Sequence, residues 1–206
     1  MSFYSHLILP RLLNAAMSAK PIGRQREKVV PRAEGCVLEV GFGAGHNLPF
    51  YDASRVSRIW ALEPAKEMRV RAAGRVAASP IPLEFLDLPG EQIPLEDGAA
   101  DTVLVTYTLC TIPDVLAALR QMRRVLKPTG RLLFCEHGES PDENVRRWQR
   151  RLEPAWKAVG GGCHLSRAIP HLINESGFSI DAMESMYLPG TPRFAGFNYW
   201  GSARTR

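Results

Sequence analysis

Short apolar runs alternate with longer amphipathic segments along most of the chain. The apolar runs, bounded by glycine, proline or charged residues, predict strands at residues 36–40, 59–62, 83–86, 102–106, 131–135, 178–187 and 194–203. Segments with helical periodicity predict helices at residues 3–19, 24–32, 66–78, 115–126, 142–158 and 165–176. Strands that alternate with helices are typical of a parallel sheet covered on both faces, so the sequence predicts an α/β fold.

The number of domains can be judged from whether repeats or linkers interrupt this pattern. The 206 residues contain no internal repeat and no linker rich in proline, glycine or serine. A chain of this length is enough for one domain of ordinary to large size. We therefore expect a single domain over residues 1–206, with a helical lead-in at 1–34 and a helical cover at 138–176.

The positive charge of the chain does not by itself indicate a nucleic-acid partner. The formal net charge is +5, and many basic residues are spaced as on solvated helix faces: Arg120, Arg123, Arg124, Lys127, Arg146, Arg147, Arg150 and Arg151. A nucleic-acid surface would be better supported by interleaved aromatic residues or a recognisable reading module, and neither is evident. We expect a small-molecule partner and no nucleic acid.

Cysteine usage and hydropathy indicate the compartment. No run of about 18 apolar residues occurs, and the apolar patch near the N-terminus is interrupted by Pro10 and Arg11 without a basic segment before it. The four cysteines are far apart and include no CxxC pair, as is common for reduced thiols. The expectation is a cytoplasmic protein without stable membrane insertion, with its oligomeric state left open.

A glycine-rich loop follows the first predicted strand. Gly41, Gly43 and Gly45 stand where the backbone must turn sharply and let a ligand approach the main chain. A helix N-terminus just beyond the loop would offer free N–H groups. Glu39 places an anion close to the loop, which suits a ligand with an amino group better than one with two phosphates.

A second acidic residue supports a nucleoside ligand. Glu63 ends the next predicted strand, where a carboxylate can accept both hydroxyls of an adenosine ribose. The third glycine of the loop falls one residue too early for the dinucleotide-binding pattern GxGxxG. The ligand is therefore expected to be adenosine attached to an amino acid.

These strings resemble the motifs of the class I S-adenosylmethionine-dependent methyltransferases. The resemblance covers residues 35–137 in the expected order and is carried by segments 37–47, 62–64, 90–94, 97–98, 101–103 and 125–130. It implies a Rossmann-like seven-stranded, mostly parallel sheet with an antiparallel last strand. It also implies S-adenosylmethionine as cofactor, with the glycines along its methionine and ribose parts and Gly90–Glu91 at the adenine edge. The expected cofactor-binding residues are Glu39, Gly41, Gly43, Gly45, Asn47, Glu63, Pro64, Gly90, Glu91 and Thr106.

The acceptor side is similar to a narrower group, which holds small bacterial methyltransferases and animal membrane-associated thiol S-methyltransferases. Segments 106–112, 136–137 and 148–167 carry this likeness. The animal proteins have a hydrophobic N-terminal anchor, whereas this chain has only the interrupted apolar patch. The resemblance implies methyl transfer to a small molecule, with a thiol sulfur as the leading acceptor. An N- or O-methyltransferase acting on a small metabolite or lipid-like quinone, and a protein that binds the cofactor without catalysis, remain alternatives.

Three residues are candidates for catalysis. His137 follows the fifth predicted strand, where the sheet edge opens to the cofactor, and is the first candidate base. Glu136 could hold the imidazole or cap the next segment. His164 follows a run of three glycines that resembles a lid over the acceptor.

The same region contains two other possible groupings. Cys110, His137, Cys163 and His164 could in principle form a zinc set, but only Cys163 and His164 have the spacing of a ligand pair. Cys110 and His137 could form a nucleophile–base pair, but no oxyanion-forming motif accompanies them. The sequence therefore predicts no metal site.

Overall fold

The computed structural model describes residues 9–206. The helix expected at 3–19 is therefore seen only from residue 9 onward, as α1 (Leu9–Met17), and its first six residues lie outside the described part. The following helix, α2 (Lys20–Val29), begins four residues earlier than expected. Pro21 lies in its first turn, where a missing backbone N–H costs no hydrogen bond, so it starts the helix rather than separating two helices.

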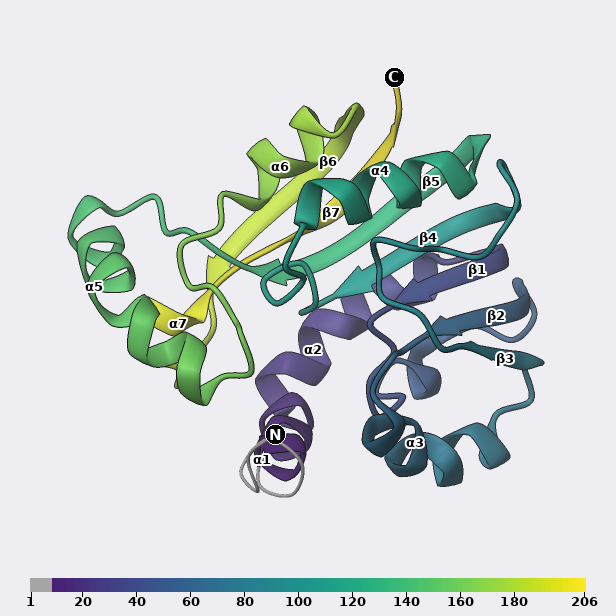
Figure 1. Ribbon diagram of the computed structural model, residues 1–206, viewed down its shortest axis with the longest axis horizontal. Helices are drawn as coiled ribbons and strands as arrows, with labels where there is room; N and C mark the ends of the chain where they lie inside the picture. Colours follow the sequence, from purple (N-terminus) through teal and green to yellow (C-terminus); the bar gives the residue numbers. More distant parts are fainter. Residues whose placement is uncertain (1–8) are drawn as a thin grey trace.

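Seven strands form one sheet in the order β3-β2-β1-β4-β5-β7-β6 (Figure 1). They are β1 (Gly35–Val40), β2 (Val56–Leu62), β3 (Leu83–Leu86), β4 (Ala100–Thr106), β5 (Leu126–His137), β6 (Phe178–Tyr187) and β7 (Phe197–Thr205). The first five are parallel to one another, and β7 is antiparallel to both β5 and β6. The predicted fold class, including the antiparallel last strand, is confirmed.

Helices cover both faces of the sheet. The remaining ones are α3 (Lys66–Ala78), α4 (Val115–Val125), α5 (Glu143–Val159), α6 (Ile169–Glu175) and the short α7 (Arg193–Gly196). One buried cluster joins α4 and α6 to the sheet, and the other joins α2 and α3 to its opposite face. Val37–Val40 of β1 is buried on both sides, as the largely apolar run predicts for a central parallel strand.

The connection from β1 to β2 differs from the expectation. No α-helix follows the glycine loop in the described chain: turns lead into a single 3₁₀ turn, Leu48–Phe50, and β2 begins at Val56. The polar side chains of Asn47 and Tyr51 turn inward onto Glu39, which holds this short connection against the sheet. The free N–H groups that follow β1 therefore come from the loop itself and not from the N-terminus of a helix directly after it.

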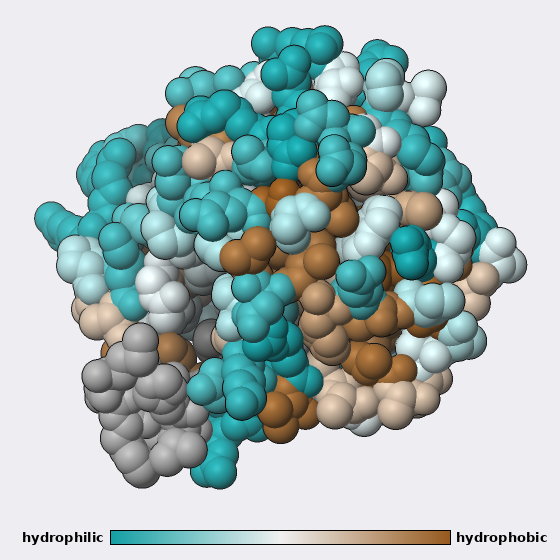
Figure 2. All heavy atoms as spheres, turned by 45° about the vertical axis from the view of Figure 1, so that its right-hand side comes forward, coloured by the Kyte–Doolittle hydropathy of each residue, from teal (hydrophilic) through white to brown (hydrophobic). Residues whose placement is uncertain are grey.

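The carboxyl ends of β1, β2, β4 and β5 meet at one edge of the sheet, on the side where α1, α2 and the end of α5 lie (Figure 1). In open α/β sheets this edge is where ligands bind. The face in Figure 2 is mostly polar, with a band of apolar residues between polar ones. Among the helices of residues 9–206, none has both the length and the apolar character needed to cross a membrane.

Candidate functional site

A cavity of about 540 Å³ opens at this carboxyl edge. Its size lies within the range of small-molecule sites, roughly 300–1,000 Å³. Six of the expected cofactor-binding and catalytic residues contribute to its wall: Gly41, Gly43, Asn47, Glu63, Thr106 and His137. Residues of α1 and α2 and of the segment that follows α5 complete it.

The glycine loop forms one wall through its backbone. Gly41 and Gly43 have φ values of +73° and +58°, in the left-handed region that favours glycine. A Cβ on Gly41 would lie 2.2 Å from Thr108 Oγ1, so this glycine is required for packing against the loop after β4. A Cβ on Gly43 would have Met68 Cε as its nearest neighbour, at 3.7 Å, so its missing side chain leaves space on the cavity side. Gly43 thus has the bare backbone that a close-lying ligand needs.

Glu63 lies beside this loop at the end of β2. Its Oε2 accepts a hydrogen bond from the Gly43 N–H at 2.8 Å, and its Oε1 accepts one from the Ala65 N–H at 2.9 Å. Burial raises the pKa of this carboxyl, although both backbone hydrogen bonds act to lower it. Each oxygen retains a second acceptor position, so the fixed carboxylate can still bind a vicinal diol.

Asn47 brings a polar group to the same cavity. Its Nδ2 donates to Glu39 Oε1 at 2.9 Å and to Thr106 Oγ1 at 3.0 Å, whereas its buried Oδ1 has no hydrogen-bond partner within the described chain. Glu39 also accepts a bond from the Tyr51 hydroxyl and does not line the cavity. Sequence reasoning expected Glu39 to face the ligand; the structure places it behind Asn47, which it orients.

Arg26 of α2 is a site residue that the sequence did not reveal. Its side chain lines the cavity although the residue is only 4% exposed, and burial lowers the pKa of the guanidinium. It donates to the Met17 carbonyl and lies over the Tyr107 ring, while its buried Nε has no hydrogen-bond partner among residues 9–206. The only signal in the sequence was a basic residue on an otherwise polar helix, which is indistinguishable from a solvated one.

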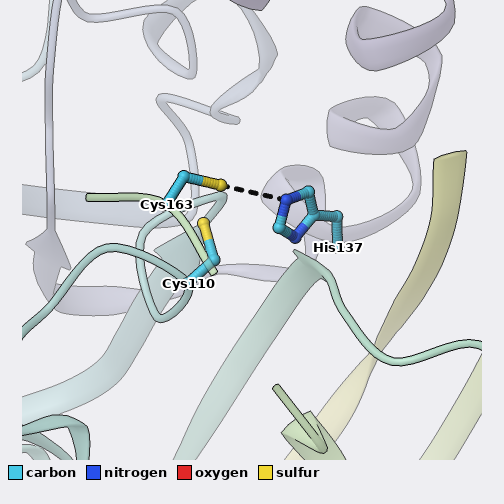
Figure 3. A group of neighbouring side chains, drawn as sticks. All are labelled: Cys110, His137 and Cys163. Carbon is cyan, nitrogen blue, oxygen red and sulfur yellow. Dashed lines mark hydrogen bonds between the residues drawn. The ribbon is translucent and has the colours of Figure 1, made fainter. Parts of the chain in front are cut away.

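The opposite end of the cavity contains sulfur and imidazole groups (Figure 3). Cys110, His137 and Cys163 all line the cavity, and their ligand atoms lie within 4.8 Å of one another. Cys163 Sγ is 3.1 Å from His137 Nε2. We name these three residues the sulfur–imidazole cluster. These residues are far apart in the sequence, and they meet because β4, β5 and the loop after α5 end at the same edge of the sheet.

The pKa values of the three groups in this cluster are shifted in different directions. Hydrogen bonding from Cys110 and then from His137 holds the pKa of the Cys163 thiol well below its usual range, against the effect of burial. Burial is the strongest influence on the pKa of His137 and acts to lower it, but the hydrogen bond with Cys163 and the charges of Cys163 and Glu136 together raise the pKa. The pKa of Cys110 is raised by the hydrogen bond to Cys163 and by burial. The cluster is thus a polar, electron-rich end in a cavity with largely apolar walls.

The other two candidate catalytic residues face away from the cavity. Glu136 is fully buried and accepts a hydrogen bond from the Thr108 N–H at 2.8 Å, while His137 Nδ1 has no partner in the described part of the chain. Glu136 thus holds the turn after β4, which is neither of the two roles that the sequence left open for it. His164 Nδ1 lies 3.1 Å from Glu153 Oε1 of α5, and the residue does not line the cavity.

Four more expected cofactor contacts lie outside the cavity wall. Gly45 packs against Leu48 and Phe42, Gly90 is buried against Ile112, Ala118 and Val40, and Pro64 is exposed. Glu91 accepts a hydrogen bond from the Asp114 N–H just before α4. The adenine edge at Gly90–Glu91 therefore stays a prediction.

The remaining groups fit a nucleoside joined to a charged amino acid. Gly43 offers bare backbone, Glu63 a diol acceptor, Arg26 an incompletely paired cation, and Asn47 a free carbonyl oxygen. Within a 3-2-1-4-5-7-6 sheet, such a binding edge defines the class I S-adenosylmethionine-dependent methyltransferases.

Comparisons with known proteins agree with this class. Residues 38–134 match the family described as "Methyltransferase domain". The chain is 33% identical over 169 residues to thiol S-methyltransferase TMT1B of Homo sapiens, covering 78% of this chain and 68% of that protein. It is 34% identical over 155 residues to TMT1B of Rattus norvegicus, covering 73% and 63%. An S-adenosylmethionine-dependent methyltransferase structure from Mesorhizobium loti superposes with a TM-score of 0.67 at 19% identity, covering 91% of this chain and 98% of that one.

The chain belongs to the class I S-adenosylmethionine-dependent methyltransferases, and S-adenosylmethionine is its cofactor. It spans about two thirds of the length of the two curated relatives described above.

Proposed function

We propose that this protein transfers the methyl group of S-adenosylmethionine to the thiol sulfur of a small molecule. The observation that carries the proposal is the cavity itself, which joins the glycine loop and Glu63 at one end to the sulfur–imidazole cluster at the other. The similarity to proteins named thiol S-methyltransferases supports the choice of acceptor atom.

The cofactor end is assigned to four residues. Glu63 takes the ribose diol, and the Gly43 backbone lies along the chain between ribose and amino acid. The Arg26 guanidinium binds the carboxylate, and Asn47 Oδ1 accepts from the ammonium group. When bound, S-adenosylmethionine would supply a sulfonium methyl group for in-line transfer to the acceptor sulfur, whose proton would leave to water. Positioning the acceptor within roughly 3–3.5 Å is then the main demand on the protein.

The acceptor end is assigned to the cluster and its cover. Trp156, Gly160 and Gly161 join Cys163 in lining the cavity, which supports the proposal that residues 138–176 cover the acceptor. The mostly apolar wall favours thiols with an apolar body over charged metabolites. His137 is the proposed polar contact for the acceptor sulfur, whereas Glu136 and His164 act through the backbone and α5.

A methyl-transfer screen tests the acceptor. Purified protein with labelled S-adenosylmethionine is offered dithiothreitol, hexanethiol, hexylamine and phenol, and labelled product is counted. We expect thiol methylation to exceed that of the amine and the phenol by about tenfold or more, because sulfur is intrinsically the most nucleophilic of the acceptor atoms offered. Preferred transfer to the amine or the phenol would contradict the thiol assignment. Cofactor binding without transfer to any acceptor would indicate a binding protein.

The assignment of Arg26 gives a second expectation. Arg26→Gln removes the charge facing the cofactor carboxylate, so affinity for S-adenosylhomocysteine should fall by about 10- to 100-fold, the worth of a charged hydrogen bond. Affinity for 5′-methylthioadenosine, which lacks the amino acid, should stay within about twofold. Calorimetry measures both, with Arg24→Gln at an exposed position of the same helix as the control. Equal weakening of both ligands would show that Arg26 acts through the fold instead.

We also propose a cytoplasmic location and no nucleic-acid substrate. All four cysteines, each within the described residues, are free, which fits a reducing compartment. The cavity is formed by apolar and mixed polar side chains rather than by a basic groove with stacked aromatic residues.

A further inference from the structure

The sulfur–imidazole cluster brings three metal-binding side chains to one point from three separate parts of the fold. Cys110 comes from the loop after β4, His137 from the end of β5, and Cys163 from the loop between α5 and α6. Figure 3 shows both sulfur atoms and the imidazole ring directed toward one another. Their ligand atoms lie within 4.8 Å of one another, and the shortest named separation is 3.1 Å, between Cys163 and His137.

These separations, from 3.1 Å to at most 4.8 Å, bracket those between the ligand atoms of a zinc ion. Bonds of about 2.3 Å to sulfur and about 2.0–2.1 Å to nitrogen place tetrahedral ligand atoms roughly 3.5–3.8 Å apart. The Cys163–His137 pair is a few tenths of an ångström too close, so its atoms would move apart on binding. Cys163 follows Gly160–Gly162, and a Cβ on Gly162 would meet nothing closer than 3.9 Å, so its loop has room for this adjustment.

The types of ligand in the sulfur–imidazole cluster indicate which metal ion it would bind. Two thiolates and one imidazole favour zinc over magnesium or calcium, which prefer oxygen ligands. A closed structural zinc site has four protein ligands, whereas a site with three keeps one position for water or substrate. All three cluster residues line the cavity, so the fourth position would face the space proposed for the acceptor.

We propose that Cys110, His137 and Cys163 bind a zinc ion whose open position takes the acceptor sulfur as a thiolate. The metal site stands on the cluster alone; the role of its open position rests on the proposed thiol methyltransferase function. On binding, the acceptor's S–H bond breaks, its electron pair stays on sulfur to form the bond to zinc, and the proton leaves to water. His137 is then a metal ligand, and no general base is needed to remove the acceptor proton.

Cobalt provides a spectroscopic test that does not depend on methyl transfer. The reduced, chelator-treated protein is titrated with Co²⁺, which gives thiolate-to-cobalt charge-transfer bands and visible bands of tetrahedral intensity when bound by sulfur. We expect saturation at one ion per chain, and Zn²⁺ should displace the cobalt because it binds such sites more tightly. Absence of these bands at stoichiometric cobalt would overturn the metal site.

Single substitutions assign the ligands. Cys163→Ser and His137→Gln should each weaken cobalt binding at least about tenfold, and Cys110→Ser should do the same if it folds, as circular dichroism would show. The matched control is Cys36→Ser, at the opposite end of β1, which should bind cobalt as the wild type does. Unchanged bands in the folded Cys163→Ser variant would refute the assignment, whatever the behaviour of the buried Cys110.

A thiol probe separates the two parts of the proposal. Ethanethiol added to the cobalt protein should raise the charge-transfer absorbance by about half, since a third sulfur joins two. An unchanged spectrum would overturn the role of the open position but leave the metal site. Thiol methylation that is equally fast in metal-free and zinc-loaded protein would overturn that role as well. Intact cobalt binding without methylation of any thiol would instead refute the proposed function.

Discussion

Gly43→Val is expected to abolish cofactor binding while leaving the sheet folded. The valine Cβ would enter the space beside Met68 that the glycine leaves on the cavity side, where its two methyl groups would occupy the position of the ligand. The φ of +58° adds strain of roughly 1–2 kcal/mol for any residue with a Cβ. Calorimetry with S-adenosylhomocysteine should show a loss of affinity of at least about 100-fold, or about 2.7 kcal/mol.

A variant at a second glycine distinguishes backbone strain from blockage of the cavity. Gly190 has a φ of +73° and open space around its missing Cβ, but it does not line the cavity. Gly190→Val should therefore lower the melting temperature by an amount similar to Gly43→Val and retain cofactor binding. If both variants bind S-adenosylhomocysteine equally well, the glycine loop does not form the cofactor-binding wall that is assigned to it.

The fold could be predicted largely from local sequence. Largely apolar runs such as residues 36–40 form buried parallel strands, since both faces of each strand are covered. The antiparallel β7 followed from family resemblance and not from the pattern itself. The sequence also suggested a helix after the glycine loop, where the structure has turns and one 3₁₀ turn. Glu39 explains the difference, because its buried carboxylate binds Asn47 and Tyr51 from the connection itself.

The cofactor end was more predictable than the acceptor end. Gly43 and Glu63 follow strands directly, so their place at the sheet edge is set by strands only a few residues away. Cys110, His137 and Cys163 are far apart in sequence, and only the order of β4 and β5 in the sheet and the path after α5 bring them together. Spacing rules for metal sites detect pairs of ligands on one turn or hairpin. No two residues of this cluster lie on the same turn or hairpin.

Glu39→Gln is expected to make stability less dependent on pH. Burial raises the pKa of Glu39 to about 7, in spite of hydrogen bonds from Tyr51 and Asn47 that act to lower it. Between the unfolded pKa of 4.5 and the folded value, the native state holds a proton that the unfolded chain has lost. The carboxyl therefore stabilises the fold most at low pH, and this contribution is lost progressively as the pH rises from 4.5 to about 7.

The difference in stability between wild type and Glu39→Gln isolates the contribution of the Glu39 carboxyl. Urea unfolding at pH 5 and pH 8 should show Glu39→Gln gaining on the order of 2 kcal/mol relative to wild type at the higher pH. Glu136, whose pKa burial also raises to about 7, is common to both proteins and cancels in the comparison. The control is Glu84→Gln, an exposed carboxyl on β3. A constant difference between wild type and Glu39→Gln at both pH values would mean that Glu39 stays ionised in the fold, held by Asn47, Tyr51 and the nearby Arg26.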